Sequence, residues 1–232
     1  MKNLKKSIMT IVASILVFSS VTTCCIAAPE VSVGTLDVCE NTSEYDEVVE
    51  TLQERGTEIL NQLNPKTRAI VKFFDIERLL QSDSRWGSVK LGNTNVSMAS
   101  EGCCITSFTM IHRYLSGSAD TPADVNTKLG TNGYPLNYSK AAETYGYTIK
   151  AAHSVAMTDA NATATIIGAM DTYSLPVLVG MQSSSTTHFV VASGYNSGGG
   201  ILIRDPASTT YTLLSQYLDK GYEVNRIYVF GK

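Results

Sequence analysis

The second half of the chain alternates short apolar runs with turn-forming segments, which is typical of a β-sheet. Runs rich in β-branched and apolar residues predict four strands, at 176–181, 188–195, 200–205 and 226–230. The sequence Asn-Ser-Gly-Gly-Gly at 196–200 lies between the second and third runs. Because such a segment forms a tight turn, these two strands are expected to make an antiparallel hairpin.

The first half instead repeats apolar residues at helical spacing. Four of them follow i, i+4, i+7 and i+11, which predicts one buried helical face: Cys104, Phe108, Ile111 and Leu115. Thr121 and Pro122 are typical of an N-cap and a first-turn proline, so a helix is expected from there through Leu129. Further helices are predicted at 43–63, 69–80, 139–145 and 159–173. Helices followed by an antiparallel sheet indicate an α+β fold.

The N-terminal residues have the layout of a secretory signal peptide. Lysines at positions 2, 5 and 6 precede an apolar run at 8–18, and small residues follow near Ala27. We expect cleavage after Ala27 and export of the mature protein. A membrane anchor is the alternative, but the run contains hydroxyl residues and is short for a span. A lipoprotein site at Cys24 is disfavoured because the three residues before it are not small.

These features divide the chain into a signal peptide at 1–27, an N-terminal helical extension or prosegment at 28–77, and a compact domain at 78–232. Because nothing in 28–77 marks a processing site, an extension is favoured over a prosegment. About 200 mature residues suffice for one substantial core, so disulfides are not required for stability.

Charge and cysteine content narrow the function classes. The net charge of the whole chain is −3, and loss of three lysines with the signal peptide makes it −6. Nothing is basic enough to predict nucleic acid as a partner, and no membrane contact is expected after processing. Three cysteines remain in the mature chain: Cys39, Cys103 and Cys104. An odd number in an exported protein leaves at least one thiol unpaired.

Cys103 is the candidate nucleophile. It lies at the expected start of the helix that buries Cys104, where unpaired backbone N–H groups and the helix dipole stabilise a thiolate and an oxyanion. The alternatives are that both cysteines are small buried hydrophobic residues, or that they form a vicinal disulfide. The helical phase places Cys104 on the apolar face, so Cys103 is expected to face a cleft.

His188 and Asp205 are candidates for the base and its acceptor. His188 opens one strand of the predicted hairpin and Asp205 ends the other, so both should lie at the same end. An acid can bind one imidazole nitrogen and leave the other facing a thiol. The alternatives are a structural histidine and a turn aspartate before Pro206. His112 and His153 are interpreted as structural or exposed, and the spacing of histidines and cysteines does not predict zinc.

Several sequence blocks resemble the C39-like peptidase family, a branch of the papain-like cysteine peptidases. They are Gln81 to Gly87, Leu91-Gly92, Gly102-Cys103 with Thr106-Ser107 and Met110, Thr121-Pro122, Asn132 to Tyr134, Pro176 to Val179, His188 to Val191 with Gly194-Tyr195, and Asp205-Pro206. Together they span about 78–232. The resemblance implies a papain-like fold, Cys103 as nucleophile, His188 as general base and acid, Asp205 as orienting acceptor and Gln81 in the oxyanion hole. It implies no cofactor and a peptide or protein substrate.

Two departures from the family pattern keep alternatives open. The family usually has Gly-Pro after the cysteine, whereas this chain has Cys104 and Ile105, and a side chain at 104 would crowd the oxyanion pocket. The chain also has no transporter domain, so leader processing cannot be inherited from the founding members. The main interpretation is a secreted cysteine peptidase. The alternatives are a cell-wall peptide hydrolase or amidase, and an inactive papain-like binding module.

Overall fold

The computed structural model describes residues 45–232. The expected signal peptide at 1–27, Cys39 and the beginning of the 28–77 extension lie outside the described residues. Within them, the chain forms helices and one antiparallel sheet, and the α+β class is confirmed.

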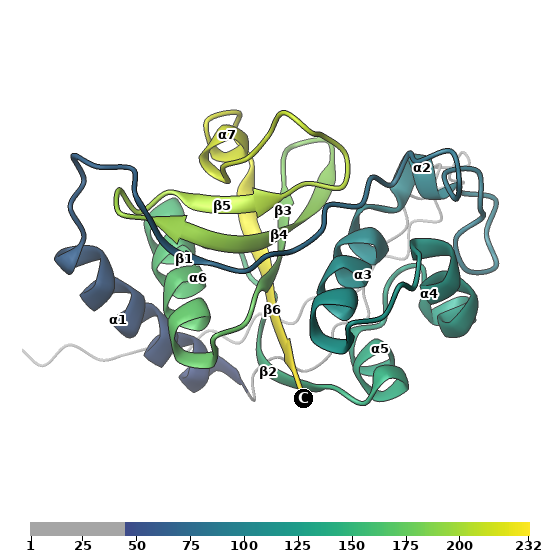
Figure 1. Ribbon diagram of the computed structural model, residues 1–232, viewed down its shortest axis with the longest axis horizontal. Helices are drawn as coiled ribbons and strands as arrows, with labels where there is room; N and C mark the ends of the chain where they lie inside the picture. The colour runs from purple at the N-terminus through teal and green to yellow at the C-terminus, as the bar shows by residue number, and fades with distance from the viewer. Residues whose placement is uncertain (1–44) are drawn as a thin grey trace, which may run out of the picture. The chain divides into compact units, whose positions relative to one another are not determined.

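Six strands form one antiparallel sheet (Figure 1). The strand order is β1-β4-β3-β6-β2, and β5 pairs with β4 beside this path. The strands are β1 (Ile70–Phe73), β2 (Thr148–His153), β3 (Val177–Gln182), β4 (Thr187–Asn196), β5 (Ile201–Arg204) and β6 (Glu223–Gly231). The predicted hairpin is confirmed, since β4 and β5 pair antiparallel with Val191 opposite Arg204. This register places the start of β4 and the end of β5 at the same end of the hairpin.

The helices lie on both sides of this sheet. In Figure 1, α1 and α6 are on one side, and α3, α4 and α5 are on the other. The longer helices are α1 (Asp46–Gln62), α3 (Cys103–Ser116), α4 (Pro122–Leu129), α5 (Tyr138–Tyr145) and α6 (Asp159–Tyr173), and short helices are α2 (Met98–Glu101) and α7 (Ser215–Leu218). Thr121 caps α4 through a capping box with Asp124, as its sequence predicts.

α3 is the central helix of the domain. All residues from 105 to 112 are buried, so the helix is covered on all sides rather than along the single face predicted from its spacing. Ser107 donates from its hydroxyl to the carbonyl of Phe189 at 3.2 Å, which ties the helix to β4. The start of α3 is thereby held against the strand that carries His188.

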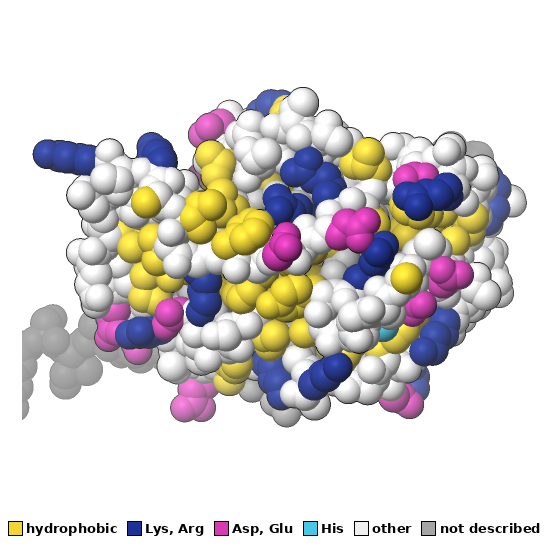
Figure 2. Space-filling model, viewed as in Figure 1, with side chains coloured by type: hydrophobic (Ala, Val, Ile, Leu, Met, Phe, Trp, Pro, Cys, Tyr) yellow, Lys and Arg dark blue, Asp and Glu magenta, His cyan; other side chains and the backbone are white. Residues whose placement is uncertain are grey.

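The predicted helix at 69–80 is wrong. The structure has strand β1 at 70–73 followed by a non-helical segment, because Ile70, Val71 and Phe73 favour an extended backbone. The strand pairs with β4 through Ile70, Lys72 and Phe73. These three side chains are 62, 48 and 42 % exposed on the edge strand. Figure 2 shows apolar side chains gathered on the face that β1 crosses in Figure 1. Strand β2 and helix α7 also form where the sequence analysis expected no element.

α1, which belongs to the predicted extension, packs closely on α6. A Cβ atom added at Gly56 of α1 would overlap the carbonyl oxygen of Ala164 on α6. A Cβ atom added at Gly168 of α6 would likewise overlap the carbonyl of Leu52. Each helix has glycine at the contact, and the absence of a side chain there allows the two backbones to lie directly against each other.

Replacing Gly56 by alanine is expected to destabilise the protein. The added methyl group forces α1 and α6 apart, and overpacking of this kind costs about 1–3 kcal/mol. The same substitution at an open helical position would instead stabilise by roughly 1 kcal/mol. Urea denaturation of Gly56→Ala measures the sign, with the exposed Glu54→Ala on the same helix as control. A stabilised Gly56→Ala would contradict the close packing of α1 on the domain.

Candidate active site

Cys103 is the first residue of α3, and Gly102 is the N-cap. Its side chain is partly exposed, and both it and Cys104 are free thiols. The neighbouring thiol has a different environment. Cys104 lies with its Sγ 3.7 Å from the Tyr138 hydroxyl, and burial raises the pKa of Cys104 far above its usual value. Cys104 is therefore a neutral thiol at physiological pH.

His188 bridges the thiol and a carboxylate. Its Nε2 lies 2.9 Å from Oδ1 of Asp205, so Nδ1 is the ring nitrogen left for Cys103, which interacts with His188 and raises its pKa. Burial lowers the pKa of His188. The interactions of the ring with Asp205 and Cys103, and the charges of both, outweigh burial and raise the pKa from 6.5 to about 9. The imidazole therefore carries both protons at neutral pH and is ready to donate one of them.

Asp205 is fully buried directly after β5. Burial raises the pKa of this carboxyl, but hydrogen bonds from His188 and Tyr217, the charge of His188 and the backbone N–H of Ala207 outweigh it and lower the pKa. The Ala207 N–H donates to Oδ1 at 2.8 Å, and the Tyr217 hydroxyl donates to Oδ2 at 2.5 Å. Asp205 is thus a charged acceptor with hydrogen bonds at both oxygens, rather than only the turn residue considered as its alternative.

Gln81 lies in the segment between β1 and α2. Its side-chain Nε2 donates to the carbonyl of Ala99 at 2.9 Å, and its backbone N–H donates to the carbonyl of Pro206 at 2.8 Å. The side-chain Oε1 is buried and finds no hydrogen-bond partner among the described residues. The loop is held by Trp86, which is 1 % exposed and donates from its indole to Leu80. One Nε2 hydrogen of Gln81 is engaged, and the second remains for another acceptor.

A pocket with a cavity volume of about 50 Å³ opens beside Cys103. It lies between the start of α3, the 133–138 segment and the beginning of β4, and its walls are mostly apolar: Cys104, Ile105, Pro135, Leu136, Tyr138 and Phe189. Glu101, Tyr134 and Thr187 supply polar groups to it. The thiol of Cys103 therefore borders a recess that can take part of a ligand.

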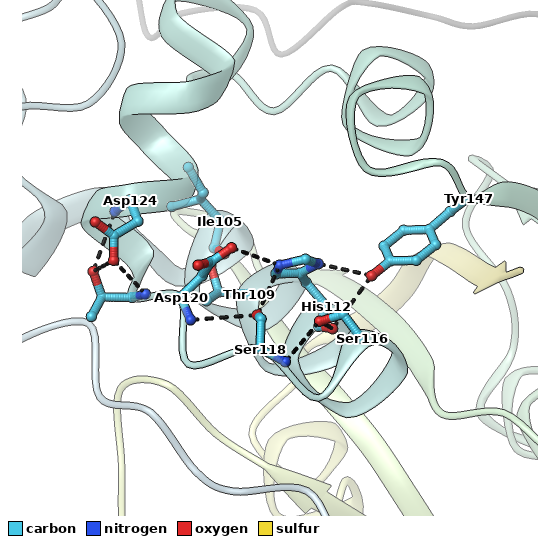
Figure 3. A network of polar contacts seen from close by, with 9 residues as sticks. Ile105, Thr109, His112, Ser116, Ser118, Asp120, Asp124 and Tyr147 are labelled. Carbon is cyan, nitrogen blue, oxygen red and sulfur yellow. Dashed lines mark hydrogen bonds and ion pairs between the residues drawn. The ribbon is translucent and has the colours of Figure 1, made fainter.

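The other two histidines have different surroundings. His112 is buried in α3, with Nδ1 2.8 Å from the Tyr147 hydroxyl and Nε2 2.9 Å from Asp120 (Figure 3). Ser118 completes this network at 3.1 Å from Nε2, so His112 is structural. His153 is the last residue of β2 and is half-buried.

Tyr217 was missed by the sequence analysis. It lies in the short helix α7, where its hydroxyl contacts Asp205 and its ring centroid is 5.1 Å from that of His188. No motif marks it, because it is one of 12 tyrosines and is separated from Asp205 by a loop. Only the course of the chain after β5 brings it to the site.

Among residues 45–232, no three His, Cys, Asp or Glu side chains are grouped as a metal ion would require. Over the same range, no helix combines the length and the apolar character needed to cross a membrane.

Comparison with known proteins identifies one relationship. Residues 75–226, more than half of the chain, match the model of the Peptidase_C39 like family. No curated protein and no solved structure matches the chain. The family predicted from the sequence blocks is confirmed, and the fold is of the papain-like kind.

Proposed function

The chain belongs to the Peptidase_C39 like family, whose function is of the peptidase type, and we propose that it is a secreted cysteine peptidase. The observation that carries this proposal is the position of His188. It joins the Cys103 thiol on one side to a buried, charged Asp205 on the other. A nucleophile, a protonated base and an orienting acid in this order are the elements of acyl transfer through a covalent intermediate.

The reaction follows from these contacts. The Cys103 thiolate attacks the peptide carbonyl carbon, and the carbonyl π electrons move to oxygen to give a tetrahedral oxyanion. The C–N bond then breaks, and His188 gives its proton to the departing amine, which leaves a thioester on Cys103. Water attacks the thioester as neutral His188 takes its proton, and collapse of the second intermediate expels the thiolate and releases the carboxylic acid.

The oxyanion requires donors at the start of α3. The Cys103 backbone N–H is free of an intrahelical partner because it belongs to the first turn. The second Nε2 hydrogen of Gln81 is the other donor in this proposal, while the first holds the amide on Ala99. Donors of this kind contribute about 10²–10³ in rate. The side chain of Cys104 was expected to crowd the oxyanion pocket, but its thiol contacts Tyr138 instead. This contact supports a working site over an inactive binding module.

Alkylation of the reduced mature protein with iodoacetamide at pH 6 tests the proposal. An ordinary thiol with a pKa of about 8.5 is only about 0.3 % ionised there, so a stabilised thiolate should react about 100 times faster. We expect peptide mapping to find the label on Cys103, and the fast reaction to disappear in His188→Ala. His153→Ala removes a histidine on β2, three strands away from β4, and should label like the wild type. Equal, slow labelling of all three cysteines would contradict the proposed mechanism.

A further inference from the structure

The environment of Asp205 depends on a residue from outside the Cys-His-Asp set. The Tyr217 hydroxyl donates to Oδ2 at 2.5 Å, whereas His188 and Ala207 both donate to Oδ1. Without Tyr217, Oδ2 would be buried with no hydrogen bond among those described for this carboxylate. A carboxylate held at one oxygen can rotate about its terminal torsion, which is broad, and hydrogen bonds on both oxygens remove that freedom.

The ring of Tyr217 also covers the hydrogen bond between His188 and Asp205. It lies tilted at 38° to the imidazole, with centroids 5.1 Å apart. On its other sides it packs edge-on against Tyr211 at 4.9 Å and Tyr222 at 5.3 Å. Tyr217 is 8 % exposed. This aromatic cluster keeps water from the pair, and a charged hydrogen bond is stronger where water is excluded.

We propose that Tyr217 is a positioning residue, which acts through Asp205 to hold the His188 imidazole toward Cys103. The inference rests on the proposed function, because it assigns Tyr217 a task within the same site. Tyr217 touches neither the thiol nor the pocket beside it in any contact described above. Its contacts within the Cys-His-Asp set are with the carboxylate and the imidazole, and we expect its effect on the reaction to pass through them.

The test combines Tyr217→Phe with Asp205→Asn and uses two readings. The first is the rate of Cys103 alkylation at pH 6, which needs no substrate. The second is the pair of kinetic constants kcat and KM, each determined separately for a peptide that the wild type cleaves. Tyr217→Phe keeps the ring and removes only the hydroxyl. Tyr211→Phe is the matched control, since Tyr211 packs on the same ring but has no described contact with Asp205.

We expect Tyr217→Phe to lower both the alkylation rate and kcat about tenfold, which is the effect of losing one hydrogen bond to a charged group. KM should stay within about twofold, because Tyr217 does not line the pocket beside Cys103. In the Asp205→Asn background the same substitution should change the alkylation rate less than about twofold, because non-additivity identifies groups that act as one unit. Tyr211→Phe should behave as the wild type.

Three results would overturn the inference. Alkylation and kcat unchanged in Tyr217→Phe would show that the hydroxyl positions nothing. An equal loss in the wild-type and Asp205→Asn backgrounds would show that Tyr217 does not act through Asp205. Wild-type alkylation that does not depend on His188 would remove the proposed function together with this inference. The first of these results, with alkylation still dependent on His188, would remove the inference alone.

Discussion

Replacing Cys103 by alanine is expected to lower kcat for peptide hydrolysis by about 10⁵-fold or more, which is the scale seen when a catalytic nucleophile is removed. The reason is that the adjacent thiol is not activated to replace Cys103. Burial raises the pKa of Cys104, and its Sγ lies beside the Tyr138 hydroxyl, so the neighbouring thiol stays neutral. Turnover is measured by following new amino groups released from a peptide mixture. Since Cys103 is partly exposed, the free energy of unfolding should change by less than about 1 kcal/mol.

Cys104→Ala is the matched control for this experiment. It removes the adjacent thiol from the same helical turn and should retain hydrolysis. Turnover that persists in Cys103→Ala, or that vanishes only in Cys104→Ala, would reject Cys103 as the nucleophile. If wild type, Cys103→Ala and Cys104→Ala are all inactive and fold alike, the binding-module interpretation takes precedence.

Replacing Asp205 by alanine is expected to reduce both activity and stability. Three donors converge on this fully buried carboxylate, and its removal leaves the His188 imidazole, the Tyr217 hydroxyl and the Ala207 N–H without their acceptor. Breaking a buried charged pair in this way costs about 3–5 kcal/mol. Loss of the acid that orients the base should lower kcat by about 10²–10⁴-fold, a smaller effect than loss of the nucleophile. Chemical denaturation and peptide turnover measure the two effects separately.

The stability difference between wild type and Asp205→Ala should depend on pH in a defined direction. The pKa of Asp205 is lowered from 3.8, so its stabilisation is present above pH 3.8 and is lost as pH falls. The pKa of His188 is raised from 6.5 to about 9, so its stabilisation is complete below pH 6.5 and is lost as pH rises toward 9. The stability difference between wild type and Asp205→Ala should therefore be greatest between pH 3.8 and pH 6.5. A pH-independent difference would contradict a charged His188–Asp205 pair.

The arrangement of the candidate triad was largely predictable because it depends on short-range order along the chain. A Gly-rich turn between two apolar runs predicts a hairpin, and the hairpin places His188 and Asp205 at one end whatever surrounds it. Apolar residues at helical spacing similarly predict that a helix starts near Cys103. Local periodicity and turn chemistry act over a few residues, so they can be read without knowing the rest of the molecule.

Residues that meet only through long-range contacts were predicted wrongly or not at all. Apolar residues at 69–80 can suit a helix or a strand, and β1 forms there because β4 offers a backbone to pair with. The contact between Gly56 and α6 also has no local signal.

The amino-acid sequence by itself determined the family, the α+β class and the identity and order of Cys103, His188 and Asp205. The tertiary structure alone decided that Gln81 is anchored on Ala99, that Cys104 faces Tyr138 and that Tyr217 closes over the carboxylate. The physical reason is that side-chain chemistry and short-range periodicity are properties of the chain itself. Which hydroxyl or amide satisfies a buried polar atom depends instead on how distant segments pack together.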